Sequence, residues 1–585
     1  MLKTLVKSIR QYKKQTIATP CLMICEAVME IVIPYIMSLL LGVLQDAEAA
    51  GTAVDMGSVW MYGGIMVALA ILSLVLGGLG GLLAAQASAG FSANLRHDMY
   101  EKIQTYSFTN IDRFSTSSLI TRLTTDATNV QQAFQMLIRM FVRTPVMFIM
   151  AIVMSFIVNP TIAWLFIVAA VVMAVVVVFI MLKAIPNFQR MIKKYDKLNA
   201  VTQENLTAIR VVKSYVREDY ETEKYKDATQ QAYDCAIAAE KWMVTLMPAV
   251  QAILYVTMFL LFFLGGNMYL GGTLQIADLT ALLTYAMQIL TSVIMLAMVL
   301  NFWSIAKPSA ERIVEVLNEE STMKDPENPV CEVKDGSIDF NNVRFLYEGS
   351  TGEDVLKDVN LHIRSGETIG IIGGTGSSKT SLVSLIPRLY DVSEGSVQVG
   401  GVDVRDYSIE TLRNNVAMVL QKNVLFSGSI EKNMRWGKED ATIEEIEEAC
   451  RQAQAQDFIE RKAQKYDYDL GQGGVNVSGG QKQRLCIARA LLKNPKVIIF
   501  DDSTSAVDTK TDAKIRAELK KAAPDCTKIF IAQRISSVQD ADRIIVMDAG
   551  RVVGFDTHEN LLRSNEIYQD VYYSQVKGGD SDGGR

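Results

Sequence analysis

Residues 367–380 read Glu367-Thr368-Ile369-Gly370-Ile371-Ile372-Gly373-Gly374-Thr375-Gly376-Ser377-Ser378-Lys379-Thr380. The apolar start of this stretch predicts a buried strand, and residues 381–389 after it predict an apolar helix. A glycine-rich loop between a strand and a helix is the arrangement of a P-loop, whose backbone N–H groups and helix N-terminus bind phosphate. The second half of the chain is therefore predicted to be an α/β domain that binds a nucleotide.

The residue types of this loop indicate how a nucleotide would be held. Lys379 would neutralise the β- and γ-phosphate oxygens, and the hydroxyl of Thr380 would hold Mg²⁺. The expected nucleotide-binding residues are Gly373, Gly374, Thr375, Gly376, Ser377, Ser378, Lys379 and Thr380. Because the pattern GxxxxGK[ST] has glycine where Ser378 stands, we expect this loop to bind phosphate with altered geometry.

Two further segments follow the P-loop. The apolar residues 497–500 predict a strand ending in Asp501, which is well placed to hold Mg²⁺ through water. Between the two motifs, a helix that continues to Leu492 is preceded by Val477-Ser478-Gly479-Gly480-Gln481-Lys482-Gln483-Arg484. This last segment resembles the signature sequence of ATP-binding cassette (ABC) proteins, and the three motifs occur in that family's order. The resemblance extends over nearly the whole chain.

The resemblance implies roles for other residues. Tyr347 is similar to the aromatic residue that stacks on adenine, although a strand-core tyrosine is the alternative. Gln421 resembles the glutamine that touches Mg²⁺ and reports to the membrane loops. Asp508 ends a segment, Ser505-Ala506-Val507-Asp508, that resembles the loop crossing the dimer interface. In this family two nucleotide domains enclose two ATP molecules, so the signature would contact the γ-phosphate of ATP held by the other subunit through Ser478, Gly479, Gly480 and Gln481.

Two positions expected to act in hydrolysis also depart from the family pattern. In active members a glutamate that polarises the attacking water follows the strand's aspartate, but this position is Asp502 here. A general base must lie about 2.6 to 3.2 Å from the proton that it takes, and the shorter side chain withdraws the carboxylate. The family's switch histidine is replaced by Gln533. The three histidines of the chain, His97, His362 and His558, lie in other segments.

These departures imply a site that binds ATP and Mg²⁺ well but hydrolyses ATP poorly. The signature is intact apart from Val477 in place of leucine, so it would complete a site on another subunit. This asymmetry resembles heterodimeric bacterial multidrug exporters. We therefore predict an obligate heterodimer with a second six-span subunit that keeps glutamate and histidine at the positions of Asp502 and Gln533.

Composition separates the chain into two halves. It has 585 residues, of which 49% are hydrophobic and 21% charged, so two or more domains are expected. Residues 1–305 carry 22 Lys and Arg against 19 Asp and Glu, whereas residues 306–585 carry 36 against 45. A net-acidic soluble half argues against a nucleic-acid partner. The seven cysteines are scattered without CxxC spacing, which is typical of reduced thiols and not of a zinc site.

The first half contains six apolar runs, each close to the roughly 20 residues that cross a bilayer. These predicted membrane helices are at about 17–44, 59–85, 136–158, 161–182, 246–268 and 276–300. The long loops 86–135 and 183–242 carry four and eleven Lys and Arg, whereas the short loops carry none. By the positive-inside rule, both termini and both long loops are cytoplasmic. A cleaved signal peptide is disfavoured, because the first run is too long and contains two glutamates.

The long loops are too long and too periodic for simple connections. We expect membrane helices to continue through them into the cytosol, with tips near residues 114–118 and 207–215 that contact the soluble half. The alternative is a pair of solvated loops. The predicted boundaries are a membrane domain at 1–305, a linker at 306–335, a nucleotide-binding domain at 336–578 and a flexible tail at 579–585.

Ionisable residues within the predicted spans suggest substrate contacts. Glu26 and Glu30 lie four residues apart, on one face of the first span. Because charges in hydrocarbon are costly, we expect them to face a polar cavity and to contact cationic substrate. The alternative is a structural pair bonded to a neighbouring span. Arg139 and Arg143, at the cytoplasmic start of the third span, are expected to extend to the membrane surface.

The fold class predicted is an all-α polytopic membrane domain followed by an α/β P-loop ABC ATPase domain. The predicted function is one subunit of a heterodimeric, ATP-driven ABC exporter in the bacterial cytoplasmic membrane, with its nucleotide-binding domain cytoplasmic. The resemblance to multidrug exporters implies efflux of drugs and other amphipathic small molecules. The apolar spans rich in Met provide adaptable surfaces with few fixed polar groups, so the sequence does not name one substrate. Alternatives are a regulatory ATP-binding membrane subunit without net transport, and a lipid or peptide exporter.

Overall fold

The computed structural model describes residues 1–350, 352–502 and 508–580, and it divides into two compact units. Unit 1 comprises Met1–Gln104 and Ser117–Glu319, and unit 2 comprises Thr105–Thr116 and Glu320–Arg585. Within the described residues, unit 1 is helical and contains six helices long and apolar enough to cross a membrane, whereas unit 2 contains the sheets. The predicted fold class is confirmed.

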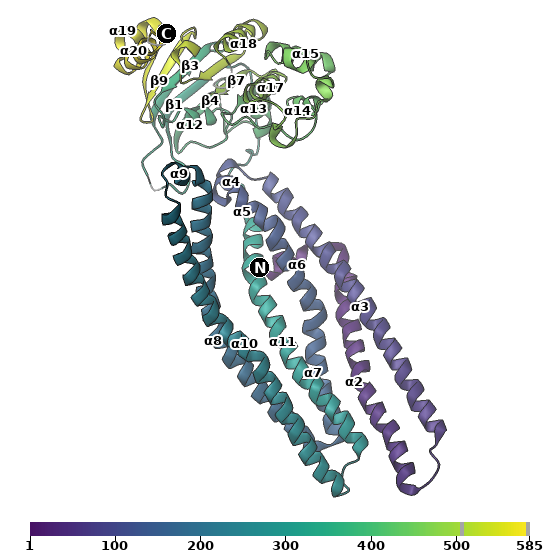
Figure 1. Cartoon of the computed structure of the whole chain (residues 1–585). Helices are drawn as coiled ribbons and strands as arrows, with labels where there is room; N and C mark the ends of the chain where they lie inside the picture. The colour runs from purple at the N-terminus through teal and green to yellow at the C-terminus, as the bar shows by residue number, and fades with distance from the viewer. Residues whose placement is uncertain (351, 503–507, 581–585) are drawn as a thin grey trace. The chain divides into compact units, whose positions relative to one another are not determined.

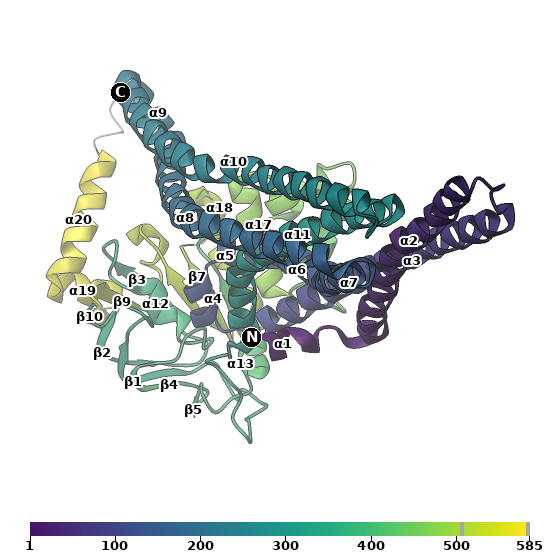
Figure 2. The ribbon, with the colours of Figure 1, turned by 90° about the horizontal axis from the view of Figure 1, so that it is seen from below.

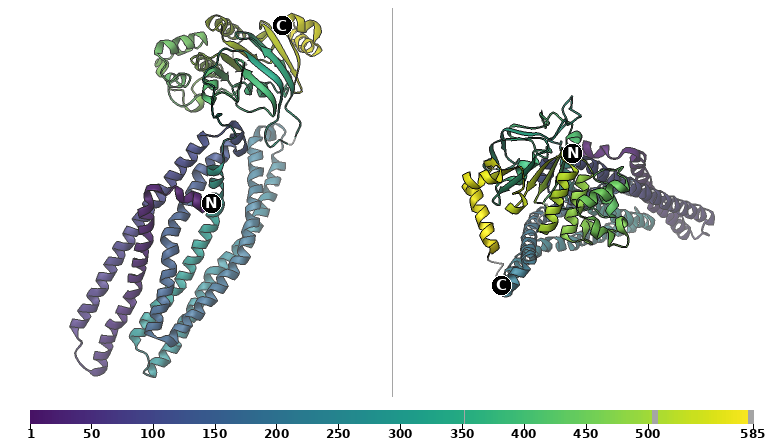
Figure 3. Two further views of the ribbon diagram at one scale, coloured as in Figure 1. Left: turned by 180° about the vertical axis from the view of Figure 1, so that it is seen from behind. Right: turned by 90° about the horizontal axis from the view of Figure 1, so that it is seen from above.

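Long helices make up unit 1 (Figure 1), and five of the six each contain one predicted span, whereas the third predicted span, 136–158, begins before its helix. They are α2 (Lys13–Ala50), α3 (Met56–Gln104), α7 (Val142–Val158), α8 (Pro160–Thr207), α10 (Glu218–Leu270) and α11 (Ile276–Asn318). Helix α7 ends a continuous helical run that also comprises α5 (Thr116–Thr121), η2 (Arg122–Asp126), α6 (Ala127–Met136) and η3 (Leu137–Phe141). Helices α7 and α11 lie between the α2–α3 pair and the α8–α10 pair (Figures 1 and 3).

The long loops are helical, as expected. Helix α3 continues 19 residues beyond the predicted span, and α8 and α10 extend similarly. Each pair of extensions is joined through a short helix, α4 (Phe108–Phe114) or α9 (Ile209–Ser214). The second tip lies where it was predicted, whereas α4 begins six residues before the predicted first tip at Phe114.

The core of unit 1 is apolar, and Tyr285 is an example of a buried polar side chain that is hydrogen-bonded there. Tyr285 of α11 is fully buried, and its hydroxyl donates a hydrogen bond to the backbone oxygen of Ile31 in α2 at 3.0 Å. Large apolar side chains such as Trp60, Phe259 and Leu270 are exposed on the outside of the bundle. Apolar outer surfaces on long helices are what a lipid environment requires.

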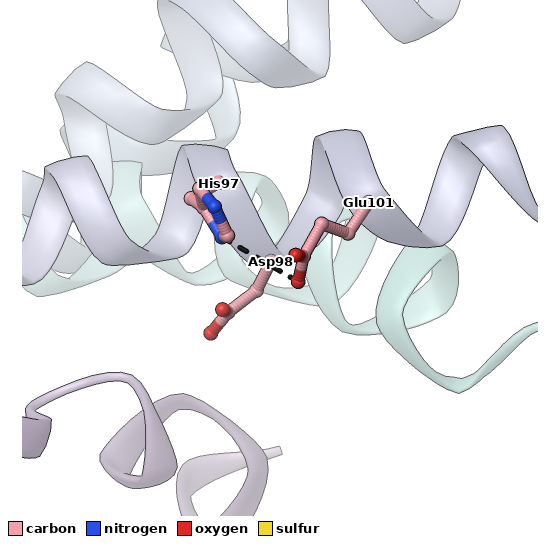
Figure 4. A group of neighbouring side chains, drawn as sticks. All are labelled: His97, Asp98 and Glu101. Carbon is pink, nitrogen blue, oxygen red and sulfur yellow. Dashed lines mark ion pairs between the residues drawn. The ribbon is translucent and has the colours of Figure 1, made fainter.

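In the N-terminal segment, α1 (Leu2–Lys7) contacts α11, and η1 (Arg10–Tyr12) packs on α3. Asp98 of α3 accepts hydrogen bonds from Ser8 at 2.7 Å and from Arg10. Asp98 also belongs to a group with His97 and Glu101, whose potential metal-ligand atoms lie within 4.8 Å of one another (Figure 4). Asp98 already binds the N-terminal segment, and the exposed His97 and Glu101 face each other one helical turn apart. These contacts account for the group without a metal ion.

Unit 2 contains two sheets. The four-stranded antiparallel sheet has the order β2 (Leu356–Ile363), β1 (Ile338–Phe345), β4 (Glu394–Val399) and β5 (Val402–Asp403). The six-stranded sheet has the order β10 (Arg551–Asp556), β9 (Arg543–Asp548), β3 (Thr368–Gly373), β8 (Thr527–Ile531), β7 (Val497–Asp501) and β6 (Val416–Val419). Every pair in the second sheet is parallel except β9–β10. Strands β3, β7 and β8 are buried nearly throughout, because both faces of a parallel sheet are covered.

Helices cover the sheets of unit 2. They are α12 (Lys379–Ser384), α13 (Ile409–Asn415), α14 (Ile430–Met434), α15 (Ile443–Gln452), α16 (Gln456–Glu460), α17 (Gly479–Leu491), α18 (Thr509–Ala522), α19 (His558–Ser564) and α20 (Glu566–Asp580), with short turns η4 (Lys465–Asp467), η5 (Gln472–Gly474) and η6 (Ile535–Ser537). Helices α19 and α20 lie together at the β9–β10 edge (Figures 1 and 2). The helix predicted at 381–389 ends at Ser384, because Pro387 disfavours helical geometry in the residue before it.

Along the chain, the boundary between the two units falls within the predicted linker, between Glu319 and Glu320. Helix α11 runs on to Asn318, so the first part of the predicted linker at 306–335 is helical. Met323 and Val333, later in that stretch, are buried and belong to unit 2. The first two residues of the predicted tail, 579 and 580, are in α20.

Candidate functional site

Parallel pairing brings the predicted nucleotide-binding residues to one edge of the six-stranded sheet. Ile371 of β3 is opposite Ile531 of β8, and Phe500 of β7 is opposite Phe530 of β8. The carboxyl ends of parallel strands meet at one edge, which is where ligands bind in open α/β sheets. The segments that leave these three ends are the P-loop, the pair Asp501–Asp502 and the loop containing Gln533.

The lysine of the P-loop points back into its own loop. Lys379 Nζ donates to the backbone oxygens of Gly373 at 2.9 Å and Gly374 at 2.8 Å, and lies 3.2 Å from Ser377 Oγ. Burial lowers the pKa of Lys379, while the charges of Asp502 and Asp501 oppose that shift. A partly buried cation beside open backbone donors suits the phosphates of a nucleotide.

Thr380 and Asp501 provide hard oxygen ligands at the base of the loop. The Thr380 hydroxyl donates to Asp501 Oδ1 at 3.0 Å, and burial raises the pKa of the Asp501 carboxyl. Hydroxyl and carboxylate oxygens are the ligand types that Mg²⁺ prefers. These residues fit the predicted Mg²⁺, which would be held by their oxygens together with oxygens of the phosphates.

Ser378 occupies a left-handed backbone conformation. Its φ is 70° and ψ is 25°, and Gly376, two residues earlier, has φ of 83°. Left-handed geometry costs an ordinary residue roughly 1–2 kcal/mol but remains accessible to it. The serine therefore adopts the conformation that glycine would adopt easily, at the cost of local strain. The altered loop geometry that we expected is not needed to accommodate it.

The two residues that depart from the family pattern are hydrogen-bonded to each other. Gln533 Nε2 donates to Asp502 Oδ2 at 2.7 Å, although the residues are 31 positions apart in sequence. Asp502 has a left-handed φ of 47°, and its N–H donates to Ile531 O at 3.1 Å, which ties it to the end of β8. Sequence reasoning identified both positions but carried no signal for this contact.

Gln421 follows a strand of the six-stranded sheet, and Tyr347 follows a strand of the four-stranded sheet. Gln421 follows β6 by two residues and is exposed, at the sheet edge where β7 ends with Asp501. The Tyr347 hydroxyl is 3.0 Å from Ser381 Oγ, in the first turn of α12. Tyr347 also packs edge-on against Phe345 and Tyr390, at ring-centre distances of 4.7 and 5.1 Å. Its half-buried ring beside the P-loop fits the predicted adenine contact.

The signature segment forms the exposed N-terminus of α17. The Ser478 hydroxyl accepts from Gln481 N, and Gln481 Oε1 accepts from Ser478 N at 3.0 Å, which makes a capping box. Ser478 and Gly479 are exposed, whereas Gly480 and Gln481 are partly buried. Asp508 caps α18 by accepting from Thr511 N at 3.0 Å, and this hydrogen bonding lowers the pKa of its carboxyl. Ser505, Ala506 and Val507 lie outside the described residues.

Helix α4 is docked within unit 2, on a tyrosine that the sequence did not single out. The Tyr390 hydroxyl donates to Asp112 Oδ2 at 2.7 Å, and the rings of Tyr390 and Phe108 are 6.0 Å apart. Because Tyr390 also packs on Tyr347, it joins the adenine-side aromatic to α4. The signal in the sequence was too weak to find it, since a lone tyrosine after the P-loop helix is unremarkable.

In unit 1, Glu26 and Glu30 share an arginine. Arg143 Nε donates to Glu26 Oε2 at 2.9 Å, and its Nη2 donates to Glu30 Oε2. The expectation that Arg143 extends to the membrane surface is wrong, because the guanidinium is bound by two carboxylates of α2. The geometry matches the structural alternative for the glutamates, in which they bond a neighbouring span.

Comparison with known proteins places both halves in one family. The family model described as ABC transporter transmembrane region matches residues 16–293, and the model described as ABC transporter matches residues 356–505. An uncharacterised ABC transporter ATP-binding protein of Bacillus subtilis, YfiB, is 34% identical over 95% of this chain and 95% of its own length.

Two further relatives describe function and fold. An ATP-dependent lipid A-core flippase of Pseudomonas aeruginosa is 32% identical over 84% of this chain and 81% of its own. A solved structure, described as a bacterial Atm1-family ABC exporter with ATP bound, has a TM-score of 0.80 and 24% identity, covering 96% of this chain and 98% of the other. At that identity the last likeness shows the fold alone.

The strain at Ser378 predicts how substitutions there change nucleotide affinity. We expect Ser378→Gly to leave the affinity of the purified chain for ATP unchanged or up to about threefold tighter, because glycine takes the left-handed conformation freely. Ser378→Val should weaken it about tenfold, since β-branched residues are outliers there and tenfold corresponds to about 1.4 kcal/mol. Equilibrium binding of a fluorescent ATP analogue measures both. If glycine weakens binding more than valine, the left-handed conformation is not the one that binds.

Proposed function

Because this chain belongs to the ABC transporter family and is an ABC exporter with fused permease and ATP-binding parts, we propose that it is the hydrolysis-impaired subunit of a heterodimer. The observation that carries this proposal is the hydrogen bond between Gln533 and Asp502. This hydrogen bond joins the two side chains at the positions where active members of the family carry the residues that catalyse hydrolysis.

The position of Asp502 is unfavourable for a general base. Its carboxylate is one carbon–carbon bond shorter than a glutamate's, and Gln533 donates into Oδ2, one of the oxygens that would accept a proton. A glutamine amide also cannot take up or release a proton at neutral pH, as a histidine can. Both features allow ATP to bind, but neither provides a group that would activate water for hydrolysis.

The remaining parts of the site support binding of ATP with Mg²⁺. Lys379 and the backbone donors of the P-loop would hold the phosphates, Thr380, Asp501 and Gln421 would surround the cation, and Tyr347 would stack on adenine. The bound cation would offset the negative charge of the phosphates. None of these side chains departs from the family pattern, and Ser378, the one departure within the P-loop, takes the left-handed conformation that glycine would take.

The partner proposed is a second ABC half-transporter. The capped N-terminus of α17 supports this, because Ser478 and Gly479 are exposed at a helix N-terminus, where a phosphate bound by another subunit would be favoured. The tip at α9 supports it too, since Val211, Tyr215 and Val216 are exposed on a cytoplasmic element. An intact signature is needed only if the nucleotide site of the partner hydrolyses ATP.

The proposed cycle begins when ATP draws the two nucleotide domains together. Helix α4, held by Tyr390 through Asp112, would carry that motion toward the membrane helices, and α9 would do so on the other side. The spans would then turn from inward-open to outward-open, and hydrolysis at the partner's site would reset them. The protein would work in the bacterial cytoplasmic membrane with both termini and the nucleotide-binding domain on the cytoplasmic side, as the charge of its loops indicates.

The substrate class proposed is amphipathic small molecules. An apolar cavity of about 580 Å³ between α7, α8 and α11 supports it, a volume in the range of drug-sized ligand sites. Its walls are apolar, and the hydroxyl of Ser292 in the lining donates to the backbone oxygen of Gln288 in the same helix at 2.7 Å. Export of a lipid, as by the Pseudomonas relative, is the alternative within the same class of transporter.

Glu26 and Glu30 are proposed to attract cationic substrates. Two carboxylates share one guanidinium, so the group retains negative charge, and the Glu30 side chain is 40% exposed. We expect Glu26→Gln with Glu30→Gln to lower vesicle uptake of cationic compounds by the co-expressed pair, with neutral compounds unaffected, because only the former lose an electrostatic attraction. Unchanged cation uptake would leave the two glutamates with a structural role alone.

A regulatory ATP-binding subunit is the rival function, in which nucleotide binding gates a partner without net transport. The departures at Ser378, Asp502 and Gln533 favour it. Substrate-stimulated ATPase activity and ATP-dependent uptake in vesicles containing the co-expressed pair separate the two functions. Transport by the pair, with no transport by either subunit alone, is the result that we expect.

The hydrolytic defect predicts a non-additive rescue. The purified chain should release phosphate from ATP slowly, and neither Asp502→Glu nor Gln533→His alone should change this much, because each leaves one unsuitable group in the pair. Together they should raise the rate about 100-fold, the scale of a general base. Phosphate release by the full chain in detergent measures the effect.

A matched control introduces the same residue types outside the site. Asp525→Glu with Gln539→His changes two exposed residues of unit 2 and should leave the rate low. ATP hydrolysis by the unmodified chain at rates normal for the family would refute the hydrolysis-impaired site and remove the need for a partner of different sequence.

A further inference from the structure

Gln575 of α20 contacts the loop that follows β8. Its Nε2 donates to the backbone oxygen of Gln533 at 2.9 Å, and its Oε1 accepts from the backbone N–H of Ile535 at 2.9 Å. The two hydrogen bonds bracket Arg534. Because an N–H must face Oε1 and a carbonyl must face Nε2, the backbone itself determines how this amide is oriented.

The loop needs such a partner because the sheet stops short of it. Strand β8 ends at Ile531, and Ala532 N still donates to Ile371 O of β3 at 3.2 Å. The peptide groups of Gln533 and Ile535 lie beyond this ladder. A glutamine side chain carries the same donor and acceptor as a peptide group, so Gln575 takes the place of the missing neighbouring strand.

Helix α20 holds Gln575 in position. Tyr568, seven residues before it, is fully buried, and its hydroxyl pairs with His558 Nδ1 of α19 at 2.7 Å. Residues seven apart lie on one face of an α-helix, so the face that anchors α20 in the core also presents Gln575 to the loop. The amide is therefore carried by a fixed support.

Gln533 is the residue that this contact holds. Its backbone oxygen accepts from Gln575, and its side-chain amide donates to Asp502 Oδ2 at 2.7 Å. The chain of contacts runs from α20 to the loop and then to the carboxylate at the end of β7. A displacement of the loop would move the Gln533 amide away from the sheet edge where the phosphates bind.

We propose that Gln575 is a positioning residue of this ATP site, which holds Gln533 where its amide meets the γ-phosphate side of a bound nucleotide. The inference rests on the proposed place of Gln533 in the nucleotide site, but not on the rate of hydrolysis. Helix α20 thereby becomes part of the nucleotide sensor, and whatever moves α20 changes how strongly the site distinguishes a triphosphate from a diphosphate.

The first test compares nucleotides that differ only in the γ-phosphate. Affinities of the purified full chain are measured with Mg²⁺ for ADP and for the non-hydrolysable β,γ-imido analogue of ATP. Gln575→Ala should weaken binding of the analogue about fivefold, which is the scale of losing a hydrogen bond that competes with water. The affinity for ADP should stay within about twofold of that of the unmodified chain. ADP has no group at the position that Gln533 reaches, so it does not report on this loop.

Gln569→Ala is the matched control, because Gln569 is on the same helix and its Nε2 donates to a backbone oxygen, that of Leu562, at 2.8 Å. It should change neither affinity. Hydrogen exchange gives a second measurement, in which the Ile535 amide loses protection in Gln575→Ala but not in Gln569→Ala. Equal weakening of both nucleotides, or equal effects of the two variants, would reduce Gln575 to a structural role and overturn the proposal.

A double-mutant cycle tests whether Gln575 acts through Gln533. In a Gln533→Ala background, Gln575→Ala should have no further effect on the ratio of the two affinities, since the side chain that it positions is gone. A full additional effect would overturn the proposal. Because the analogue is not hydrolysed, rapid hydrolysis of ATP by the unmodified chain would refute the impaired-subunit function without affecting this result.

Discussion

Parallel pairing of β3, β8 and β7 is the constraint on which the nucleotide site depends. It aligns the carboxyl ends of three strands that are far apart in sequence, so that the P-loop, the two aspartates and the loop after β8 leave the sheet at one edge. The strands are buried on both faces and have little freedom to change register. The positions of Lys379, Asp501 and Gln533 relative to one another follow from this pairing.

Beyond the sheet, the site is held by a small number of polar contacts. Asp502 and Gln533 are partly or fully exposed, and their contact with each other and with Gln575 is made of hydrogen bonds that compete with water. Each such bond contributes only about 1 kcal/mol. The loop after β8 is thus the part of the site that a motion of α20 or a bound phosphate can shift most readily, while the P-loop stays in place between β3 and α12.

In the membrane unit the constraint is the absence of water. Buried polar groups there must find partners within the bundle, as Tyr285 does at the Ile31 carbonyl and Arg143 does at Glu26 and Glu30. This explains why Arg143 does not extend to the membrane surface. Two carboxylates on α2 offer a closer partner than the headgroups, and an unpaired carboxylate would itself be costly in hydrocarbon.

The sequence by itself determined the features that depend on neighbouring residues. The six apolar runs, the strand and loop around Lys379, the strand ending in Asp501 and the helix behind Ser478 are all contiguous patterns, and their length and periodicity specify them. Even the departures at Asp502 and Gln533 are single-residue differences from the family pattern that the sequence alone shows. Only the tertiary structure decided that Gln533 bonds Asp502, that Gln575 holds Gln533, that Tyr390 meets Asp112 across 278 positions, and that Arg143 bonds α2. Those contacts depend on strand register and on which helix faces pack together, and local periodicity carries no information on either.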